Sequence, residues 1–420
     1  YQVAKRGIKV NLYDMKPNKK SPAHHSNKLC ELVCSNSLKA ARKESAAGML
    51  KEEMRMLDSL LMKCADKSKV PAGGALAVDR EIFSNLVNDE INNNPNITVI
   101  NEEVTEIPDG ITIIASGPLT SDLLSDKIKT MFGDSLSFFD AAAPIVKFDT
   151  VDMNKAFFAS RYDKGDGDDY INCPMNKEEY DNFYEALVSA ERAPVHDFDV
   201  MNPKVYEGCM PIEVMAQRGH DTIRFGPMKP VGLKDPRTGH RPWAVVQLRK
   251  ENSASIMYNL VGFQTNLKFP EQKRVFSMIP GLENAEFVRY GVMHRNTFID
   301  SPRILNSDYS VRENKNLFFA GQITGVEGYM ESASSGLMAG INAAMRYIGE
   351  QTVTLPEYTM IGSLSRYISD ETVSKFQPMG ANLGVLPELE QRPRDKKERA
   401  KAYSDRSFAK LTEFINSRGL

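Results

Sequence analysis

Cys209 is the residue of this sequence best suited to covalent chemistry. It lies in the segment VYEGCMPIEVMA, which runs from Val205 to Ala216. Pro211 lacks a backbone N–H and disfavours a helical conformation in the residue before it, so we expect a turn at Gly208 to Pro211. Cysteines that only fill a core usually lie in apolar runs. A thiol held at a bend is therefore a candidate nucleophile.

Cys34 is a second candidate thiol, because the polar residues Ser35 to Ser37 follow it. Cys30 lies four residues before it, and the two could form a redox pair. Cys-x-x-x-Cys is not a strong dithiol pattern, however. The sequence therefore leaves two uses open for Cys34, as a single thiol or as half of a disulfide.

The remaining cysteines are expected to be structural. Cys64 shares an apolar helical stripe with four other residues and is expected to fill a core. These residues are Leu50, Met54, Leu57 and Leu61. Cys173 is likewise expected to be structural. The five cysteines are scattered along the chain, which argues against a disulfide framework and against a zinc site built from Cys-x-x-Cys pairs.

The N-terminal residues have the pattern of a dinucleotide-binding unit. They predict the end of a helix, a stop at Gly7 and a strand from Ile8 to Asp14. A strand that follows a helix and ends in an acid is typical of the second half of a βαβ unit, in which the acid binds an adenosine ribose. The G-x-G-x-x-G turn of the first half is absent. Asp14 is therefore a candidate cofactor ligand, with an ordinary strand that ends in Asp as the alternative.

Two later segments favour a nucleotide cofactor. The segment GITIIASGP predicts a strand that runs into Ala115, Ser116 and Gly117, where small residues let a backbone approach a planar ligand. The segment NLFFAGQITGVEGYMESASSG predicts a buried strand, a Gly-rich turn at Gly321 and Gln322, and a helix whose N-terminus can face an anion. Together with the acidic strand end, these segments are typical of a flavin-binding Rossmann domain. The alternative is an α/β domain that binds no nucleotide.

Residues from Asp149 to about Leu282 predict a different kind of domain. The alternating segments RPWAVVQLR and MYNLVGFQT predict antiparallel strands, and Asn176 to Glu191 predicts an amphipathic helix. A further helix near Tyr403 to Asn416 carries an apolar stripe, which we expect to pack on the core.

Length and composition fit a two-domain enzyme. The chain has 420 residues, of which 41% are hydrophobic and 26% charged, and it contains no run of about 18 apolar residues that could span a membrane. We therefore expect a cytoplasmic protein. The net charge of −2 gives no general sign of nucleic-acid binding, but basic residues cluster between Lys229 and Lys250 and between Arg392 and Arg406. Such clusters are either solvated faces or phosphate contacts.

Six segments carry a family resemblance. They are ELVCSNSL (31–38), VPAGGALAVDR (70–80), YEGCMPIEVMA (206–216), FGPMKPVGL (225–233), RYGVMHRNTFI (289–299) and FFAGQITGVEGY (318–329). From Tyr1 to about Arg406 the sequence resembles the folate- and FAD-dependent tRNA (uracil-5-)-methyltransferases of the TrmFO family. A longer relative, the tRNA carboxymethylaminomethyl-modification flavoprotein, carries an extra helical domain for which this chain has no room. The family's N-terminal strand and Gly-rich loop are absent, so we expect a fragment that binds FAD weakly.

The resemblance implies a fold and a reaction. The expected fold class is α/β, with a Rossmann-type FAD-binding domain that lacks its first strand and an inserted α+β domain. The FAD-binding domain would comprise residues 1–145 and 286–420, and the inserted substrate domain residues 146–285. The expected activity is methylation of C5 of a uridine in the T-loop of tRNA, with methylenetetrahydrofolate as carbon donor and FAD and NAD(P)H as reductants. The expected partners are tRNA and folate, with neither DNA nor a membrane.

The resemblance also implies site residues. Cys209 is expected to add to uracil C6, because C5 is a poor nucleophile until a thiolate has attacked C6. Cys34 is expected to help remove the C5 proton or to protect the flavin adduct, although the two roles could be exchanged. Tyr329 is expected beside the isoalloxazine, unless it is a core tyrosine. The expected substrate contacts are His294, which would stack on folate, Arg295, and the basic residues Lys229, Arg241 and Arg249, which would bind RNA phosphates or folate glutamates.

Functions of two other classes stay open. In a flavin-dependent disulfide oxidoreductase, Cys30 and Cys34 would cycle as a pair and Cys209 would be dispensable. Without the phosphate loop, the chain could also be a non-catalytic RNA-binding protein. Within the family that the sequence resembles, the same chemistry on ribosomal RNA is a further alternative.

Overall fold

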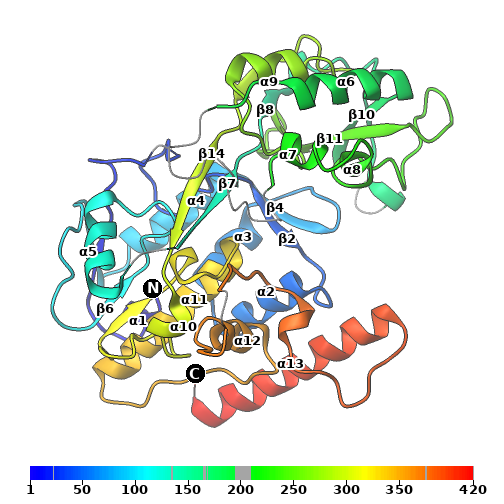
Figure 1. Cartoon of the computed structure of the whole chain (residues 1–420). Coiled ribbons are helices and arrows are strands. Elements are labelled where there is room, and N and C mark those ends of the chain that lie inside the picture. The colour runs from blue at the N-terminus through cyan, green and yellow to red at the C-terminus, as the bar shows by residue number, and fades with distance from the viewer. Residues whose placement is uncertain are drawn as a thin grey trace.

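Two large hydrophobic cores organise the molecule, and the helices and strands around them form two bodies in Figure 1. The structure, a computed structural model, describes residues 1–21, 23–133, 136–163, 167, 169–193, 210–373 and 376–419. The first core gathers buried side chains from Leu32 to Ile128 and again from Phe298 to Leu411. The second core gathers buried side chains from Val146 to Ala285. The α/β class predicted from the sequence is confirmed.

Helices from both ends of the chain surround the first core. They are α1 (Gln2–Lys5), α2 (Ala46–Met56), α3 (Leu60–Lys67), α4 (Arg80–Asn92), α5 (Asp122–Phe132), α10 (Ser301–Ile304), α11 (Tyr329–Tyr347), α12 (Met360–Tyr367) and α13 (Lys396–Arg418). Most residues of α11 are buried. Its many small side chains let neighbouring elements approach closely, as Gln2 of α1 does at Gly340.

Two parallel strand pairs belong to the first core. β1 (Val10–Tyr13) pairs with β5 (Ile97–Ile100), and β6 (Thr112–Ile114) pairs with β15 (Leu317–Phe319). Each pair is a separate two-stranded sheet among the described residues. Parallel strands are normally buried on both faces, yet Tyr13 is 41% exposed. The described parallel strands therefore form two separate two-stranded sheets, in which each strand pairs along one edge only.

An antiparallel sheet forms the second core, in the order β13-β8-β12-β11-β10-β9. Its strands are β8 (Ile145–Lys147), β9 (Phe157–Phe158), β10 (Tyr170–Met175), β11 (Ala244–Lys250), β12 (Met257–Leu260) and β13 (Phe287–Arg289). The helices α6 (Lys177–Ser189) and α9 (Phe269–Phe276) pack on this sheet through Phe183 and Phe276. The short helices α7 (Ile212–Ala216) and α8 (Thr222–Phe225) complete this part of the chain.

Two groups of strands lie between the cores. The antiparallel strands β7 (Leu136–Ala141) and β14 (Met293–Phe298) run from one core to the other (Figure 1). A small sheet in the order β2-β4-β3 is formed by β2 (Ser37–Ala40), β4 (Ala75–Val78) and β3 (Lys69–Val70). β2 directly follows the loop that holds Cys34, so this sheet positions the candidate thiol.

Most of the elements predicted from the sequence are present. α6 begins at a capping box, in which the Asn176 side chain accepts the Glu179 N–H over 2.9 Å and the Glu179 carboxylate accepts the Asn176 N–H over 2.7 Å. β11 and β12 are antiparallel as predicted. The C-terminal helix α13 packs on the first core through Leu411, which is fully buried.

One predicted helix is divided into two. The sequence predicts a single apolar stripe from Leu50 to Cys64, but α2 ends at Met56 and α3 begins at Leu60. Asp58 has a left-handed conformation with φ of 57°, and the Ser59 side chain caps α3. Cys64 still fills the first core and is 2% exposed, so its prediction as a core residue is confirmed.

The longest helix of the described ranges, α13, has 23 residues and is rich in charged side chains. None of the helices in these ranges combines the length and the hydrophobicity that crossing a membrane requires.

Candidate active site

The thiol of Cys34 lies beside the hydroxyl of Tyr329. The sulfur atom is 3.0 Å from the tyrosine oxygen, and the backbone N–H of Cys34 donates to the same oxygen over 2.9 Å. Tyr329 is the first residue of α11, directly after the turn that contains Gly325 and Gly328. Both side chains are partly buried. The fold therefore brings together two residues that are 295 positions apart.

The hydroxyl of Tyr329 can stabilise a thiolate at Cys34. Its oxygen accepts the Cys34 N–H, so its own hydrogen can point at the sulfur. Burial, and after it the charge of Cys34, raise the pKa of Tyr329 well above its ordinary value. The tyrosine therefore stays protonated and acts as the donor. A thiolate that accepts a hydrogen bond is more readily available as a nucleophile or a base.

Asn36 fixes the backbone that follows the thiol. It is fully buried, and its side-chain nitrogen donates to the carbonyl oxygens of Val78 and Lys250 over 3.1 and 2.9 Å. Its side-chain oxygen accepts from the Arg249 Nε over 3.1 Å. A buried amide whose donors and acceptor are satisfied in this way has a well-defined position. Through Asn36, the Cys34 loop is attached to both cores.

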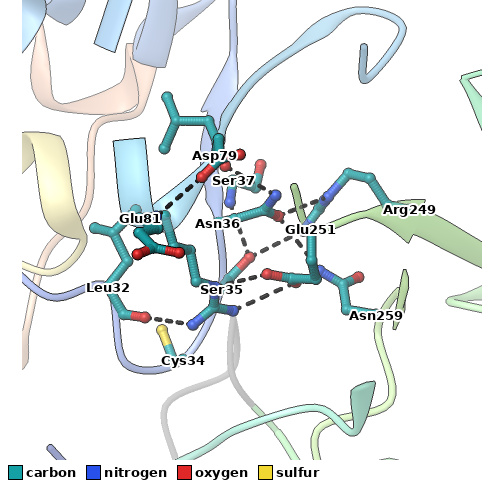
Figure 2. A network of polar contacts seen from close by, with 12 residues as sticks. Leu32, Cys34, Ser35, Asn36, Ser37, Asp79, Glu81, Arg249, Glu251 and Asn259 are labelled. Atoms are coloured by element: carbon teal, nitrogen blue, oxygen red, sulfur yellow. Dashed lines mark hydrogen bonds and ion pairs between the residues drawn. The ribbon is translucent and has the colours of Figure 1, made fainter. Parts of the chain in front are cut away.

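Further polar contacts join α4 to the sheet of the second core (Figure 2). Arg80 donates to the two carboxylate oxygens of Glu251, at 2.6 and 3.4 Å, and also to the carbonyl of Leu32. Asp79 caps α4 and accepts from the N–H and the hydroxyl of Ser253, each over 2.8 Å. These contacts hold the segment that precedes the candidate thiol.

Arg249 lies beneath the Cys34 loop rather than at an open surface. It is 7% exposed, and its guanidinium donates to Asn36 and to the Ser35 hydroxyl, the latter over 3.0 Å. The predicted contact of Arg249 with an RNA phosphate stays a prediction, whereas its hydrogen bonds favour a role in holding the loop (Figure 2).

The other two predicted basic contacts, Lys229 and Arg241, are exposed. Arg241 lines a cavity of about 740 Å³ together with Trp243, on whose ring the Arg224 guanidinium stacks at 3.7 Å from the centroid. This cavity lies at the Met175 end of the β10–β11 pair, and Arg249 lies at the opposite end. The structure therefore does not bring Arg241 and Arg249 together.

The predicted cofactor residues follow the carboxyl ends of parallel strands. Asp14 follows β1, Ala115 and Ser116 follow β6, and Gly321 and Gln322 follow β15. Nucleotide cofactors bind at this edge in open α/β sheets. Ala115 and Ser116 are exposed, and the other three residues are partly exposed.

Two glycines leave open space at this edge. Gly117 has φ of 76° and Gly321 has φ of 82°, and a Cβ atom added at either would meet nothing within 4 Å. Glycine adopts such a conformation without steric cost. The backbone there is accessible to a flat ligand, so the residues present fit a dinucleotide.

Three predicted site residues are only partly covered by the structure or not at all. Cys209 lies outside the described residues. His294 and Arg295 belong to β14, where the backbone register places them opposite Asp140 and Phe139, and their side chains lie outside the described part. The roles of these three residues stay predictions.

The other described cysteines are poorly suited to nucleophilic chemistry. Burial raises the pKa of Cys30 and of Cys173 to about 12 and that of Cys64 to about 11. Cys30 packs against the first core, as Cys64 does. No disulfide joins any two of the four described cysteines. These observations weigh against a redox pair of Cys30 and Cys34.

Sequence reasoning missed the charged groups around the thiol. Arg80 ends one of the segments that carry the family resemblance, and Arg289 begins another. Their residue type alone says little, because the ion-pair partner of Arg80, Glu251, is 171 positions away. The available signal was that both arginines belong to segments that carry the family resemblance.

The fold and the site define a mixed α/β protein with an edge suited to a dinucleotide and a candidate catalytic thiol. The family model described as Glucose inhibited division protein A matches residues 1–351. The chain is 60% identical over 418 residues to the methylenetetrahydrofolate–tRNA-(uracil-5-)-methyltransferase TrmFO of Acetivibrio thermocellus, with 99% of this chain and 95% of that protein covered. It is 59% identical to the protein of the same name from Bacillus pumilus, with 99% and 96% covered. The chain belongs to the TrmFO family.

Solved structures show the same fold. GidA of Aquifex aeolicus in its form II crystal superposes with a TM-score of 0.71 at 16% identity, over 99% of this chain and 70% of that one. The form I crystal of the same protein gives a TM-score of 0.68. At this level of identity the likeness is one of fold.

Proposed function

We propose that this protein methylates C5 of a uridine in tRNA and takes the carbon from methylenetetrahydrofolate. Relatives that bear this activity in their names are 55–60% identical over nearly the whole chain. A T-loop uridine as the target, NAD(P)H as the reductant and a cytoplasmic location are finer parts of the same proposal.

The position of Cys34 carries the proposal. Its sulfur lies 3.0 Å from the Tyr329 hydroxyl, at the start of the helix that follows the glycine turn. Methylation at C5 requires a base that removes the C5 proton, and a thiolate stabilised by a hydrogen-bond donor can serve as that base. A purely structural cysteine would need no such partner.

Two thiols would divide the reaction between them. The Cys209 thiolate would form a bond to uracil C6, so that the electron pair of the C5–C6 double bond becomes available at C5. After the one-carbon unit is attached, Cys34 would take the C5 proton, and the bond between C6 and the Cys209 sulfur would break. Tyr329 would support Cys34 by donating to its sulfur.

FAD fits the carboxyl edge of β1, β6 and β15. Asp14 would accept from the ribose, and the backbone at Gly117 and Gly321 would lie against the flat part of the cofactor. When bound, FAD supplies the redox chemistry that turns the one-carbon unit into a methyl group. The open edges of β1 and β6 support a Rossmann-type sheet in which a strand from outside these 420 residues lies between them.

The division of the chain follows the two cores. We place the cofactor domain at residues 1–145 and 286–420 and the inserted substrate domain at residues 146–285, a division that the extents of the two cores support. The exposure of Lys229 and Arg241 supports contacts with RNA phosphates or folate glutamates. His294 would stack on folate, with Arg295 beside it.

The test is methyl transfer to an unmodified tRNA transcript. The protein is supplied with FAD, NAD(P)H and methylenetetrahydrofolate labelled at the methylene carbon, and we expect the label at C5 of a T-loop uridine. Parallel reactions contain ribosomal RNA or a disulfide substrate in place of the tRNA. Label found only in ribosomal RNA would favour the ribosomal alternative. Reduction of a disulfide without methyl transfer to either RNA would favour the oxidoreductase and contradict the proposal.

A further inference from the structure

Arg289 has a buried nitrogen atom without a partner. The residue ends β13 and is partly buried, and its Nη2 atom is shielded from solvent. Within the part of the chain that the structure describes, this atom has no hydrogen-bond partner. A guanidinium is charged at all physiological pH values and carries five N–H donors. Its burial without an acceptor is unfavourable unless a ligand supplies one.

The neighbouring cation Arg80 makes this arrangement more costly. Burial lowers the pKa of Arg289, and the charge of Arg80 lowers it further. The described acids that act on Arg289 are Glu251 and Glu31. The Glu251 carboxylate already accepts from Arg80 and Asn259, and the Glu31 carboxylate accepts from the backbone N–H groups of His25 and Ser26. Arg80 is thus a paired cation, whereas the Nη2 atom of Arg289 has no partner among the described residues.

Arg289 lies close to the candidate thiol site. Arg289 interacts electrostatically with Tyr329 and with Glu251, and Tyr329 contacts Cys34. Exposed lysines and arginines are sufficient to bind the phosphates of an RNA backbone. A buried N–H beside the thiol site suits instead an oxygen of a flat base that enters the site.

Uracil provides such an oxygen during the proposed reaction. When a thiolate adds to C6, the S–C6 bond forms, the C5–C6 double bond is lost, and the electron pair spreads over C5 and the oxygen on C4. When the proton leaves C5 and the S–C6 bond breaks, the double bond returns and that oxygen becomes neutral again. A fixed donor is most effective where charge develops during the reaction.

We propose that Arg289 is a substrate-binding residue whose Nη2 donates a hydrogen bond to the C4 oxygen of the target uracil. The donor binds the oxygen most strongly after thiolate addition, when the oxygen carries negative charge. This inference rests on the proposed methylation of uridine and adds the group that stabilises the intermediate.

The test compares Arg289→Met with Arg80→Met. Each change replaces a guanidinium by an apolar chain of similar reach. Arg289→Met removes an unpaired charge, so we expect a Tm equal to or above that of the wild type and a fall in kcat for tRNA methylation of about a hundredfold. Arg80→Met leaves Glu251 without its cation, so we expect its Tm to fall by several degrees. Arg289→Lys should recover part of the lost rate.

A second readout follows thiolate addition directly. A T-arm RNA hairpin with 5-fluorouridine at the target position should form a covalent complex with the wild-type protein that survives denaturation, and Arg289→Met should form it much more slowly. Normal methylation and normal complex formation by Arg289→Met would overturn the inference, as would a lowered Tm with unchanged kcat. Normal complex formation with a raised KM for methylenetetrahydrofolate would assign the Nη2 contact to the pterin and also overturn it. Absence of methylation and of complex in the wild type would instead refute the proposed function.

Discussion

Cys34 owes its chemical setting to atoms from distant parts of the chain. The Tyr329 hydroxyl accepts its N–H and lies against its sulfur, and Asn36 fixes the loop from below. The sequence predicts Cys34 as a working thiol because polar residues follow it, and the resemblance to the TrmFO family supports that assignment. The sequence does not predict the contact of Cys34 with Tyr329, because a contact between residues so far apart in the chain depends on the fold.

We expect Tyr329→Phe to lower the rate of methyl transfer about tenfold at neutral pH. The variant keeps the ring but loses the donor to the Cys34 sulfur, so the thiolate is less favoured. The pH dependence of kcat/KM checks this, and its rising limb should move to higher pH.

Tyr367→Phe is the matched control. The Tyr367 hydroxyl donates to the Gln377 carbonyl over 2.7 Å, and its ring lies against Phe376, so its described contacts include neither Cys34 nor Tyr329. The Tyr367→Phe variant should lose about 1 kcal/mol of stability or less and keep the wild-type pH dependence of kcat/KM. An unchanged profile in Tyr329→Phe would contradict the proposed role of the hydroxyl.

The glycine turn between β15 and α11 lies at the edge where we propose that FAD binds. Gly321 follows β15 with φ of 82° and has open space where a Cβ would stand. Gly7, between α1 and β1, has φ of 77° and equally open space. The two positions therefore match in backbone strain and in free space, and they differ in that only Gly321 lies at the proposed cofactor edge.

We expect Gly321→Ala to weaken FAD binding at least tenfold, because a methyl group would occupy the space beside the cofactor. Gly7→Ala should cost a similar amount of stability, about 1 to 2 kcal/mol, without weakening FAD binding. Titration of each variant, monitored by quenching of flavin fluorescence, measures the Kd, and thermal unfolding measures the stability. Equal affinities of the two variants for FAD would show that Gly321 does not contact the cofactor.

Local patterns predict single elements well in this chain. The capping box of α6 and the buried run of β15 both follow from short stretches of sequence. The division between α2 and α3 was not predicted, because the apolar stripe continues in phase across Asp58, whose left-handed backbone ends α2. The periodicity of apolar residues indicates which face of a helix is buried. It does not indicate a break in the helix when the residues on both sides of the break bury the same face.

At the scale of the whole molecule, Asn36 joins the two cores. Its amide nitrogen donates to Val78 on one side and to Lys250 on the other, and its oxygen accepts from Arg249. Asn342 is equally buried, but its amide donates to Val353 and Asp308, within the first core.

We expect Asn36→Ala to lose about 3 kcal/mol of stability, because several buried groups lose their partners. Asn342→Ala should lose a comparable amount. Urea unfolding measures both, and methyl-transfer assays at a temperature where both variants are folded compare their activity. Only Asn36→Ala should reduce activity strongly. Similar activity of the two variants would contradict a role for Asn36 in positioning the Cys34 loop.

Glu53 gives the molecule a pH-dependent stability. It is fully buried between α12 and α13, where it accepts from the N–H groups of Met360 and Ile361 and from the Ser407 hydroxyl. Burial outweighs these bonds and raises its pKa from 4.5 to about 7. The folded state therefore holds a proton that the unfolded state releases between pH 4.5 and 7.

Because the folded state binds more protons in this window, the contribution of Glu53 to stability falls as the pH rises from 4.5 through 7. The loss is of the order of 3 kcal/mol. Glu53→Gln does not titrate and should show a flatter dependence of unfolding free energy on pH, measured with urea at several pH values. The same slope in the variant and the wild type would assign the titration to other groups.

The overall architecture could be predicted only in part. The resemblance gave the α/β class, and the change in pattern near residue 149 indicated the second core. The two separate parallel sheets and the polar contacts between the cores could not be predicted. Hydrogen bonds such as that from Arg249 to Asn36 join strands and loops that are far apart in sequence. Composition and periodicity carry no information about such pairs.

The most direct test of the thiol site is methyl transfer by three cysteine variants. Labelled methylenetetrahydrofolate, FAD, NAD(P)H and unmodified tRNA are incubated with Cys34→Ala, Cys209→Ala and Cys64→Ala, and label at uridine C5 is counted. We expect Cys34→Ala and Cys209→Ala to lose at least 99% of the rate. Cys64→Ala should keep it and lose only about 1 to 2 kcal/mol of stability as a small core truncation. Full methylation by a folded Cys34→Ala variant would contradict the account.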